Sequence, residues 1–233
     1  MSIFPGKVVL ATDGSAEAEL ASRSAVELAD KTGSELHIVH VWSPPLYYHP
    51  ERHSYHAHYE QQREEARHLL GEQVEGIRRS GGSVAEAHFA DGVPDEEIVK
   101  AADNLDAGLV VTGSRGLGGI RRTLLGSVSE VVVRHAHCSV LVVRTELSTT
   151  QTEVEETSIF PTKILVATDG SLSSARALRE AVELARDTDS ELHIVHVVPV
   201  STLYSSADMV LAGGGSPYTT KAVDGPSVCW PKT

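Results

Sequence analysis

The chain is poor in the features of exported and membrane-embedded proteins. Its 233 residues include only two cysteines, Cys138 and Cys229, which lie far apart and form no CxxC pair. That spacing argues against a disulfide framework and against a thiolate zinc site. No apolar run approaches the ~18 residues of a membrane helix, and no hydrophobic leader precedes "KVVLATDGS". We therefore expect a soluble protein of the reducing cytoplasm, away from membranes.

Basic residues are also scarce. The chain has 20 Lys and Arg against 32 Asp and Glu, so its formal net charge is -12. This charge would repel a phosphate backbone, and the sequence has no long basic stripe with interleaved aromatic residues. The composition therefore argues against nucleic acid as a partner.

What the sequence does contain is an internal repeat. Residues 3–41 align without gaps to residues 159–197, with 25 of 39 positions identical. Between the copies lies "TELSTTQTEVEETS", which is poor in apolar residues and typical of a solvated linker. The sequence thus predicts two modules of one kind: a first domain over residues 1–146, a linker over 147–158 and an incomplete second domain over 159–233.

The first copy alternates short β-branched runs with amphipathic ones. "KVVLA" and "ELHIVHVW" are typical of buried strands, and Leu20, Ser24 and Leu28 between them recur at helical spacing. Further strands are expected in "SVAEAHFA", "DAGLVVTG" and "SVLVVR", and further helices over residues 55–79 and in "PDEEIVKAADNL". With right-handed crossovers, this order predicts an α/β fold with an open parallel five-stranded sheet and helices on both faces.

A glycine-rich stretch, "GSRGLGGIRRTLLGSVS", occupies residues 113–129 after the fourth expected strand. It leads into a helix expected near Ser127, so it lies at the carboxyl edge of the sheet, where open α/β folds bind ligands. Glycine lets backbone N–H groups approach an anion, and the helix N-terminus adds the positive end of its dipole. The stretch is a candidate phosphate-binding loop, and a plain crossover loop is the alternative.

The spacing in this loop is G-x2-G-x9-G-S, formed by Gly113, Gly116, Gly126 and Ser127, with Arg115, Arg121 and Arg122 alongside. No GKS or GKT follows, so the loop is not a Walker A motif, and it is not GxGxxG after a first strand. Together with "ATDGS" at residues 11–15, "HIVHV" at 37–41 and "SVLVVR" at 139–144, the loop resembles the universal stress protein family. ATP-binding members of that family carry this spacing, and the resemblance covers residues 3–144.

The resemblance implies the universal stress protein fold and a site for ATP with Mg²⁺. It puts the phosphates on the glycine loop and the helix start, and the rest of the nucleotide at the ends of the first two strands. The implied cofactor-binding residues are Ala11, Thr12, Asp13, Val41, Gly113, Arg115, Gly116, Gly126, Ser127 and Val128. The resemblance also implies a nucleotide-dependent regulator of the stress response.

Three of these residues have plainer interpretations as well. Asp13 would meet a ribose hydroxyl or the magnesium ion carried by ATP, or would only form an Asx turn. Ser127 would bind phosphate, and it would cap the helix in either case. Val41 would pack on adenine or belong to the ordinary core.

Catalytic patterns are missing around the loop. No Ser-His-Asp order, paired carboxylates or nucleophilic lysine accompanies it. This favours a binding protein with at most slow ATP hydrolysis. An ATP-hydrolysing or nucleotidyl-transferring enzyme is one alternative, and a nucleotide-free dimeric interaction module is the other.

The second copy keeps "ATDGS" with Asp169 and "HIVHV" with Val197, but no G-x2-G-x9-G-S spacing follows. We therefore expect an incomplete second sheet and one ATP per chain. In the family the last strand, here Ser139 to Arg144, is used in dimerisation. Without a matching strand in the second copy, this apolar edge predicts a homodimer through Val140, Leu141 and Val142, unless the second copy covers it.

Histidines form a separate candidate. One group of four lies close together in the sequence: His49, His53, His56 and His58. This group is either a zinc site or part of a polar solvated face. Two others, His37 and His40, recur in the second copy as His193 and His196. Their recurrence predicts a shared place, either in strand-end packing or near adenine.

Overall fold

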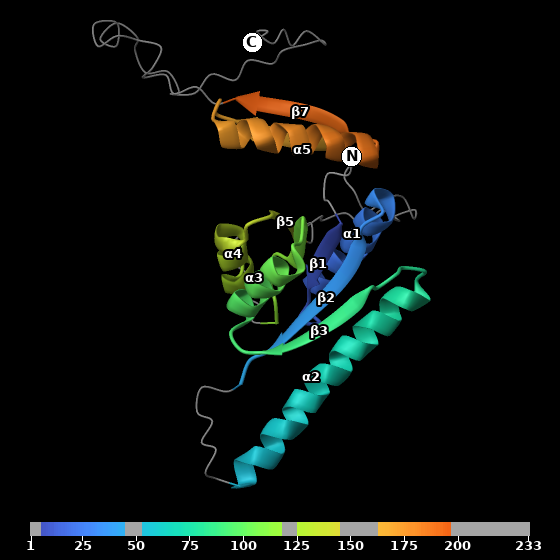
Figure 1. The fold of residues 1–233 in the computed structure, drawn as a ribbon, viewed down its shortest axis with the longest axis vertical. Coiled ribbons are helices and arrows are strands. Elements are labelled where there is room, and N and C mark those ends of the chain that lie inside the picture. The colour runs from blue at the N-terminus through green and yellow to red at the C-terminus, as the bar shows by residue number, and fades with distance from the viewer. Residues whose placement is uncertain (1–5, 45–52, 118–124, 145–162, 197–233) are drawn as a thin grey trace, which may run out of the picture. The chain divides into compact units, whose positions relative to one another are not determined.

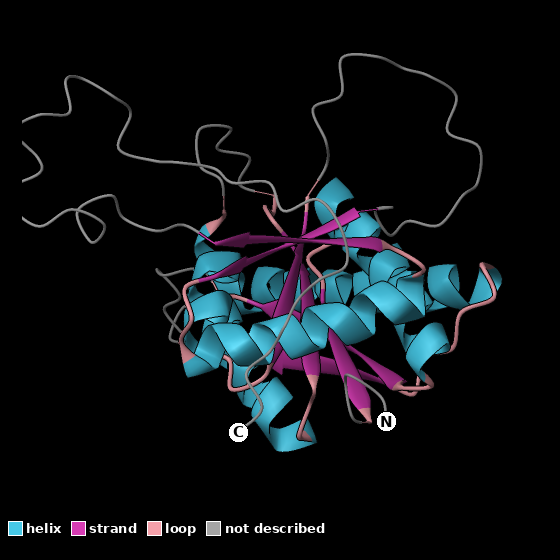
Figure 2. Ribbon diagram, turned by 90° about the horizontal axis from the view of Figure 1, so that it is seen from above, coloured by secondary structure: helices cyan, strands magenta, loops and turns pink. Residues whose placement is uncertain are grey.

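The computed structural model describes residues 6–44, 53–117, 125–144 and 163–196. The chain divides into two units, residues 1–161 and 162–233, and each unit has its own sheet. Strands and helices alternate along both units (Figures 1 and 2).

The described part of the first unit contains five strands and four helices. In chain order they are β1 (Lys7–Ala11), α1 (Ala16–Thr32), β2 (Glu35–Trp42), α2 (His53–Arg79), β3 (Glu86–Asp91), α3 (Pro94–Leu105), β4 (Leu109–Gly113), α4 (Ser127–His135) and β5 (Ser139–Val143). The strands form one parallel sheet in the order β3-β2-β1-β4-β5. This confirms the predicted five-stranded parallel α/β fold.

Alternate side chains of the central strand β1 enter two cores. Val9 and Ala11 pack with Val39 of β2 and Val110 of β4 beneath α3 and α4. Val8 and Leu10 point to the opposite face and are completely buried there. Figure 1 shows α2 on one side of the sheet and α3 with α4 on the other. Helices on both faces explain why strands such as β4 are apolar throughout.

Local signals set the ends of α1. The Ser15 hydroxyl accepts a hydrogen bond from the Ala18 N–H at 3.2 Å, which satisfies one of the free donors of the first turn. Gly33 ends the helix in the left-handed conformation, at φ 65°, where a Cβ would be strained. The β1–α1 connection at the edge of the sheet is therefore well defined by its own residues.

Two strands start later than the sequence indicated. The fourth was expected from Asp106, but Asp106 is the left-handed C-cap of α3, with φ 50° and its N–H directed at the Ala102 carbonyl. The third was expected from Ser83, but β3 begins at Glu86, opposite His37 of β2. Helix capping and the register with neighbouring strands override the local apolar pattern at both places.

The described part of the second unit is one βαβ unit: β6 (Lys163–Thr168), α5 (Leu172–Thr188) and β7 (Glu191–His196). The two strands pair in parallel. Within the described ranges of both units, no helix combines the length and the apolarity that crossing a bilayer requires.

Candidate functional site

A pocket of about 530 Å³ opens at the carboxyl ends of β1 and β4 in the first unit. These two strands are neighbours in the sheet, and the chain moves outward from them in opposite directions, to β2 and β3 on one side and to β5 on the other. Open α/β sheets bind ligands at such a reversal of strand order. The pocket volume is in the range of ordinary small-molecule sites, about 300–1,000 Å³.

The structure brings together all the residues that the sequence implied for the cofactor. They come from three strand ends and from both sides of the glycine-rich loop, and each one lines this pocket: Ala11, Thr12, Asp13, Val41, Gly113, Arg115, Gly116, Gly126, Ser127 and Val128. The central part of the loop, with Arg121 and Arg122, lies outside the described residues. Which ligand the pocket holds stays a prediction.

Asp13 joins the two loops that frame the pocket. Its Oδ1 accepts a hydrogen bond from the Ser15 N–H at 2.9 Å, which is the Asx turn considered above. Its Oδ2 accepts a second hydrogen bond from the Leu117 N–H at 3.0 Å, across 104 positions of sequence. Gly116 permits this approach, because a Cβ there would collide with the Asp13 carboxylate. The Gly116 signal in the motif therefore has a structural cause inside the protein.

The start of α4 is open toward the pocket. Gly126 is the N-cap and has no side chain with which to cap the helix, and its own N–H donates to the Ser114 carbonyl at 2.7 Å. Ser127 is thus the first helical residue and not the cap, which corrects the sequence interpretation. The N–H groups of the first turn have no acceptor within the helix, and together they form the positive end of its dipole.

Gly113 has a role that the sequence did not reveal. A Cβ at this position would lie 2.9 Å from the backbone carbon of Glu17 and 3.0 Å from the Ala18 nitrogen. The missing side chain therefore lets the first turn of α1 pack against the end of β4. A larger residue at this position would clash with the backbone of α1.

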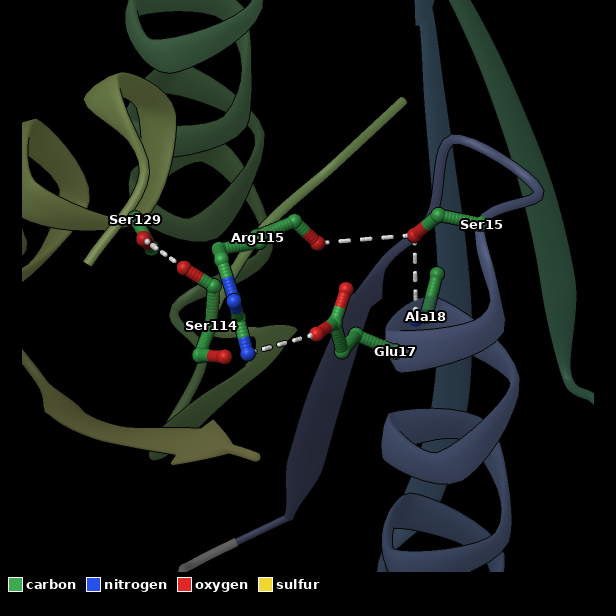
Figure 3. A network of polar contacts seen from close by, with 6 residues as sticks. All are labelled: Ser15, Glu17, Ala18, Ser114, Arg115 and Ser129. Carbon is green, nitrogen blue, oxygen red and sulfur yellow. Dashed lines mark hydrogen bonds and ion pairs between the residues drawn. The ribbon is translucent and has the colours of Figure 1, made fainter. Parts of the chain in front are cut away.

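Arg115 links the glycine-rich loop to α1, as Figure 3 shows. Its guanidinium pairs with Glu17 at 3.2 Å, and the two side chains are only 15% and 17% exposed. The Ser15 hydroxyl lies 3.5 Å from the Arg115 carbonyl oxygen, and the Ser129 hydroxyl lies 3.1 Å from the Ser114 carbonyl oxygen. One guanidinium nitrogen, Nε, is buried without a hydrogen-bond partner among the described residues.

The pocket also has lining residues that sequence reasoning missed. They are Ala18, Pro94, Ile98, Thr112, Leu117, Leu125, Ser129 and Glu130. Pro94 and Ile98 belong to the first turns of α3, and with Val41 and Val128 they make one part of the lining apolar. The Pro at the start of α3 was a visible signal, but only the sheet order shows that α3 begins beside the loop after β4.

The zinc site predicted from four neighbouring histidines stays a prediction, because most of these side chains lie outside the described residues. His49 and the side chains of His53 and His56 lie outside them, and His58 is exposed on α2. The recurring histidines do share a place: His40 Nδ1 lies 2.8 Å from the Thr12 carbonyl oxygen, and His196 Nδ1 lies 2.6 Å from that of Thr168. His40 is therefore part of strand-end packing and does not line the pocket.

Comparison with known proteins agrees with these motifs. The sequence model of the Universal stress protein family matches residues 5–144 and 161–222. A Staphylococcus aureus (strain USA300) protein named for this family is 37% identical over 144 residues, covering 60% of this chain and 84% of its own length.

Solved structures of the same family resemble the fold. A universal stress protein from Archaeoglobus fulgidus aligns over 90% of this chain and 71% of its own, with 24% identity and a TM-score of 0.61. The universal stress protein UspA from Lactobacillus plantarum aligns over 60% of this chain and 97% of its own, with 22% identity and a TM-score of 0.55.

Proposed function

Because the chain belongs to the universal stress protein family, we propose that its pocket binds an adenine nucleotide, with ATP as the expected ligand, and that the occupied protein is a regulator in the stress response. One observation carries the proposal. The residues of the G-x2-G-x9-G-S motif and the ends of β1 and β2 line a single pocket at the point where the strand order reverses.

The pocket has suitable groups for each part of a nucleotide. The open start of α4 supplies N–H groups and a positive dipole end for the phosphates. The unpartnered Arg115 Nε is a further buried donor beside the loop. Val41 and Ile98 supply apolar surface for adenine, and the Asp13 carboxylate is the natural acceptor for a ribose hydroxyl.

Magnesium fits this arrangement through Asp13. Mg²⁺ prefers oxygen ligands and usually takes one or two carboxylates together with phosphate oxygens. Each Asp13 oxygen accepts one N–H from the protein, from Ser15 and from Leu117, so lone pairs remain for a cation. Bound with ATP, the ion would neutralise phosphate charge, while Asp13 would hold it beside the loop.

Slow hydrolysis at most is the expected chemistry. The titratable residues of the described lining are Asp13, Arg115 and Glu130. Asp13 joins the two loops, Arg115 pairs with Glu17, and Glu130 pairs with Arg134 at 2.6 Å. Each charge already has a partner, which favours a nucleotide-occupied switch over an efficient enzyme. Turnover of Mg-ATP at an enzyme's ordinary rate would favour the alternative of a hydrolase.

The test adds a negative charge at the start of α4. Ser127 is exposed and is the first residue of α4. In Ser127→Glu, the new carboxylate would stabilise the helix through its dipole, but it would repel a phosphate group. We expect ATP affinity, measured by calorimetry on nucleotide-free protein, to fall about tenfold or more while the melting temperature stays the same or rises. Leu172→Glu is the matched control, because Leu172 is the exposed first residue of α5 in the second copy.

The outcomes separate the alternatives. Equal ATP affinity in Ser127→Glu and Leu172→Glu would place the phosphates elsewhere and overturn the proposed site. Absence of ATP binding by the nucleotide-free wild type would favour the nucleotide-free interaction module.

We also propose that the protein forms a homodimer through β5. This strand is an edge of the five-stranded sheet, and Val140, Leu141 and Val142 on it are only partly buried in the chain itself. A second copy of the strand would complete the edge around a two-fold axis. Light scattering should find a dimer that Leu141→Lys dissociates. A monomeric wild type at micromolar concentration would refute the dimer, and a dimer that survives the substitution would refute this interface.

A further inference from the structure

A second group of chemically active side chains lies on β2 and β3, and none of its members lines the nucleotide pocket. His37 of β2 stands directly opposite Glu86 of β3 in the strand register. Since residues two apart share a face of a sheet, Glu35 joins His37 and His88 joins Glu86 on that face. Two imidazoles and two carboxylates therefore meet across one pair of strands.

The distances between these groups suit a shared metal ion. His37 Nδ1 lies 3.1 Å from His88 Nε2, and His88 Nε2 lies 3.9 Å from Glu86 Oε2. One ligand atom from each of His37, Glu86 and His88 can be chosen so that all three lie within 4.8 Å of one another. In a tetrahedral zinc site with bonds of about 2.0–2.1 Å, neighbouring ligand atoms are about 3.3 Å apart.

The burial of His37 is the second, independent observation. The residue is only 5% exposed, and its Nε2 has no hydrogen-bond partner within the described ranges. Nε2 is not the nitrogen that faces His88, because that contact is made by Nδ1, so Nδ1 is the atom available to a metal ion. The Glu35 Oε2 atom lies 3.6 Å from His37 Nε2. Metal-binding histidines commonly direct their second ring N–H to such a carboxylate, which orients the ring.

We propose that His37 Nδ1, His88 Nε2 and the Glu86 carboxylate bind a divalent transition-metal ion such as Zn²⁺, with Glu35 orienting the His37 ring. Two imidazoles and one carboxylate are a donor set that zinc accepts, with a fourth position open to water. His88 and Glu86 are 27% and 64% exposed at the side chain, so an ion can reach the site from solvent. The metal site and the nucleotide pocket use different residues and can be tested separately.

The second copy offers a natural control for this site. Glu191 and His193 repeat Glu35 and His37 on β7, and their side chains lie 3.1 Å apart. The side chain of His193 is 47% exposed, against 6% for His37. In the described part of the second unit, the sheet is the pair β6-β7, without a strand that would supply the counterparts of Glu86 and His88. The half-cluster on β7 should therefore bind zinc no better than an ordinary exposed histidine.

The experiment is calorimetric titration of the full chain with ZnCl₂ in a non-chelating buffer. The parent variant carries His49→Ala, His53→Ala, His56→Ala and His58→Ala, so that this other group of histidines does not contribute. In this parent, Glu86→Gln and His88→Asn are expected to lose one zinc equivalent per chain or to bind it at least tenfold more weakly. His193→Asn should leave that equivalent unchanged.

A positioning role for Glu35 has its own readout. Glu35→Gln keeps all three proposed ligands and should retain the zinc equivalent with about tenfold lower affinity, as is typical when a carboxylate behind a metal-binding histidine is changed. Circular dichroism checks that each variant is folded. Glu86→Gln changes an exposed side chain, so it still tests the site if His88→Asn does not fold. Unchanged zinc binding in folded Glu86→Gln and His88→Asn would overturn the site. The same holds for a parent that binds no zinc, which would leave the His37–His88 contact as a hydrogen bond only.

Discussion

The two copies of the repeat build nearly identical turns but different surroundings. Asp13 and Asp169 each accept the N–H of the serine two residues later at 2.9 Å. The glycines between them, Gly14 and Gly170, have φ angles of 80° and 83°. Ser15 and Ser171 cap the following helices at 3.2 Å and 3.1 Å. The shared sequence "ATDGS" therefore determines a shared local structure.

What differs is the partner across the turn. In the first copy, Asp13 also accepts the Leu117 N–H, and Ser15 lies beside the Arg115 carbonyl, so the turn forms one wall of the pocket. In the second copy, Asp169 is exposed, and the neighbouring Thr168 hydroxyl bonds to the Ser174 hydroxyl of α5. The motif by itself therefore forms a turn, and the pocket is formed only where the loop after β4 lies against that turn.

The cores differ in the same way. Val9 and Ile38 are completely buried in the five-stranded sheet, whereas Leu165 and Ile194, at the equivalent positions of the second copy, are 70% and 49% exposed. Neighbouring strands and helices cover these positions in the first unit. The same βαβ sequence thus contributes to a full core in one unit and leaves apolar surface exposed in the other.

The largest expected effect is a loss of folding stability when a side chain at position 113 pushes α1 away from β4. Gly113→Val would push a β-branched side chain into the backbone of Glu17 and Ala18, and overpacking of this kind costs about 1–3 kcal/mol. We expect a lower midpoint of urea unfolding for the first unit. Gly126→Ala is the control, because a Cβ there meets its nearest atom at 3.4 Å. An unchanged midpoint in Gly113→Val would show that α1 moves freely.

The next effect tests the difference between the two aspartates. Asp13→Ala removes the bond to Leu117 that joins the two walls of the pocket, and a hydrogen bond to a charged group contributes about 1.5–3 kcal/mol. ATP affinity should therefore fall about tenfold or more in calorimetry. Asp169→Ala removes the same Asx turn from the second copy and should leave ATP affinity unchanged. Equal losses in the two variants would mean that both turns bind nucleotide.

A smaller effect should be common to both copies. Ser15→Ala and Ser171→Ala each remove an N-cap, which typically costs about 1 kcal/mol. Hydrogen exchange should accelerate in α1 for the first variant and in α5 for the second, by comparable factors. A large change for one and none for the other would contradict the local equivalence of the turns.

The smallest effect concerns acid. The hydrogen bond from the Ser171 backbone, aided by the Ser171 and Ser174 hydroxyls, lowers the pKa of Asp169 from 3.8 to about 2. Because the pKa is lower in the folded turn, the ionised Asp169 carboxylate stabilises the turn above about pH 4. This stabilisation is lost as the pH falls toward 2 and the carboxylate is protonated. NMR titration should give a midpoint near 2, and Asp169→Asn should abolish the acid-induced change at the start of α5. A midpoint near 3.8 would show that the turn is not held in solution.

Much of this architecture was readable from the sequence, because it depends on neighbouring residues. The runs "KVVLA" and "ELHIVHVW" are β1 and β2 with the expected ends, and the residues at helical spacing between them lie in α1. The glycine spacing also identified the loop that lines the pocket. Periodicity, caps and motif spacing are all local properties, so a single sequence carries them.

The remaining features depend on contacts between distant segments. No local pattern indicates that Gly113 is small because α1 passes over it, or that Arg115 pairs with Glu17. The apolar part of the pocket behind Val41 comes from α3, which reaches the site only through the order of the strands. The His37–His88 contact likewise follows from the register of β2 against β3.

The most direct test of the central claim is the number of nucleotides bound per chain. Denatured and refolded protein, free of nucleotide, is titrated with ATP and Mg²⁺ in a calorimeter. We expect one site per chain, because within the described residues only the first copy places the "ATDGS" turn beside the glycine-rich loop. Two equivalent sites would contradict this expectation, since the second copy would then bind nucleotide with its turn alone.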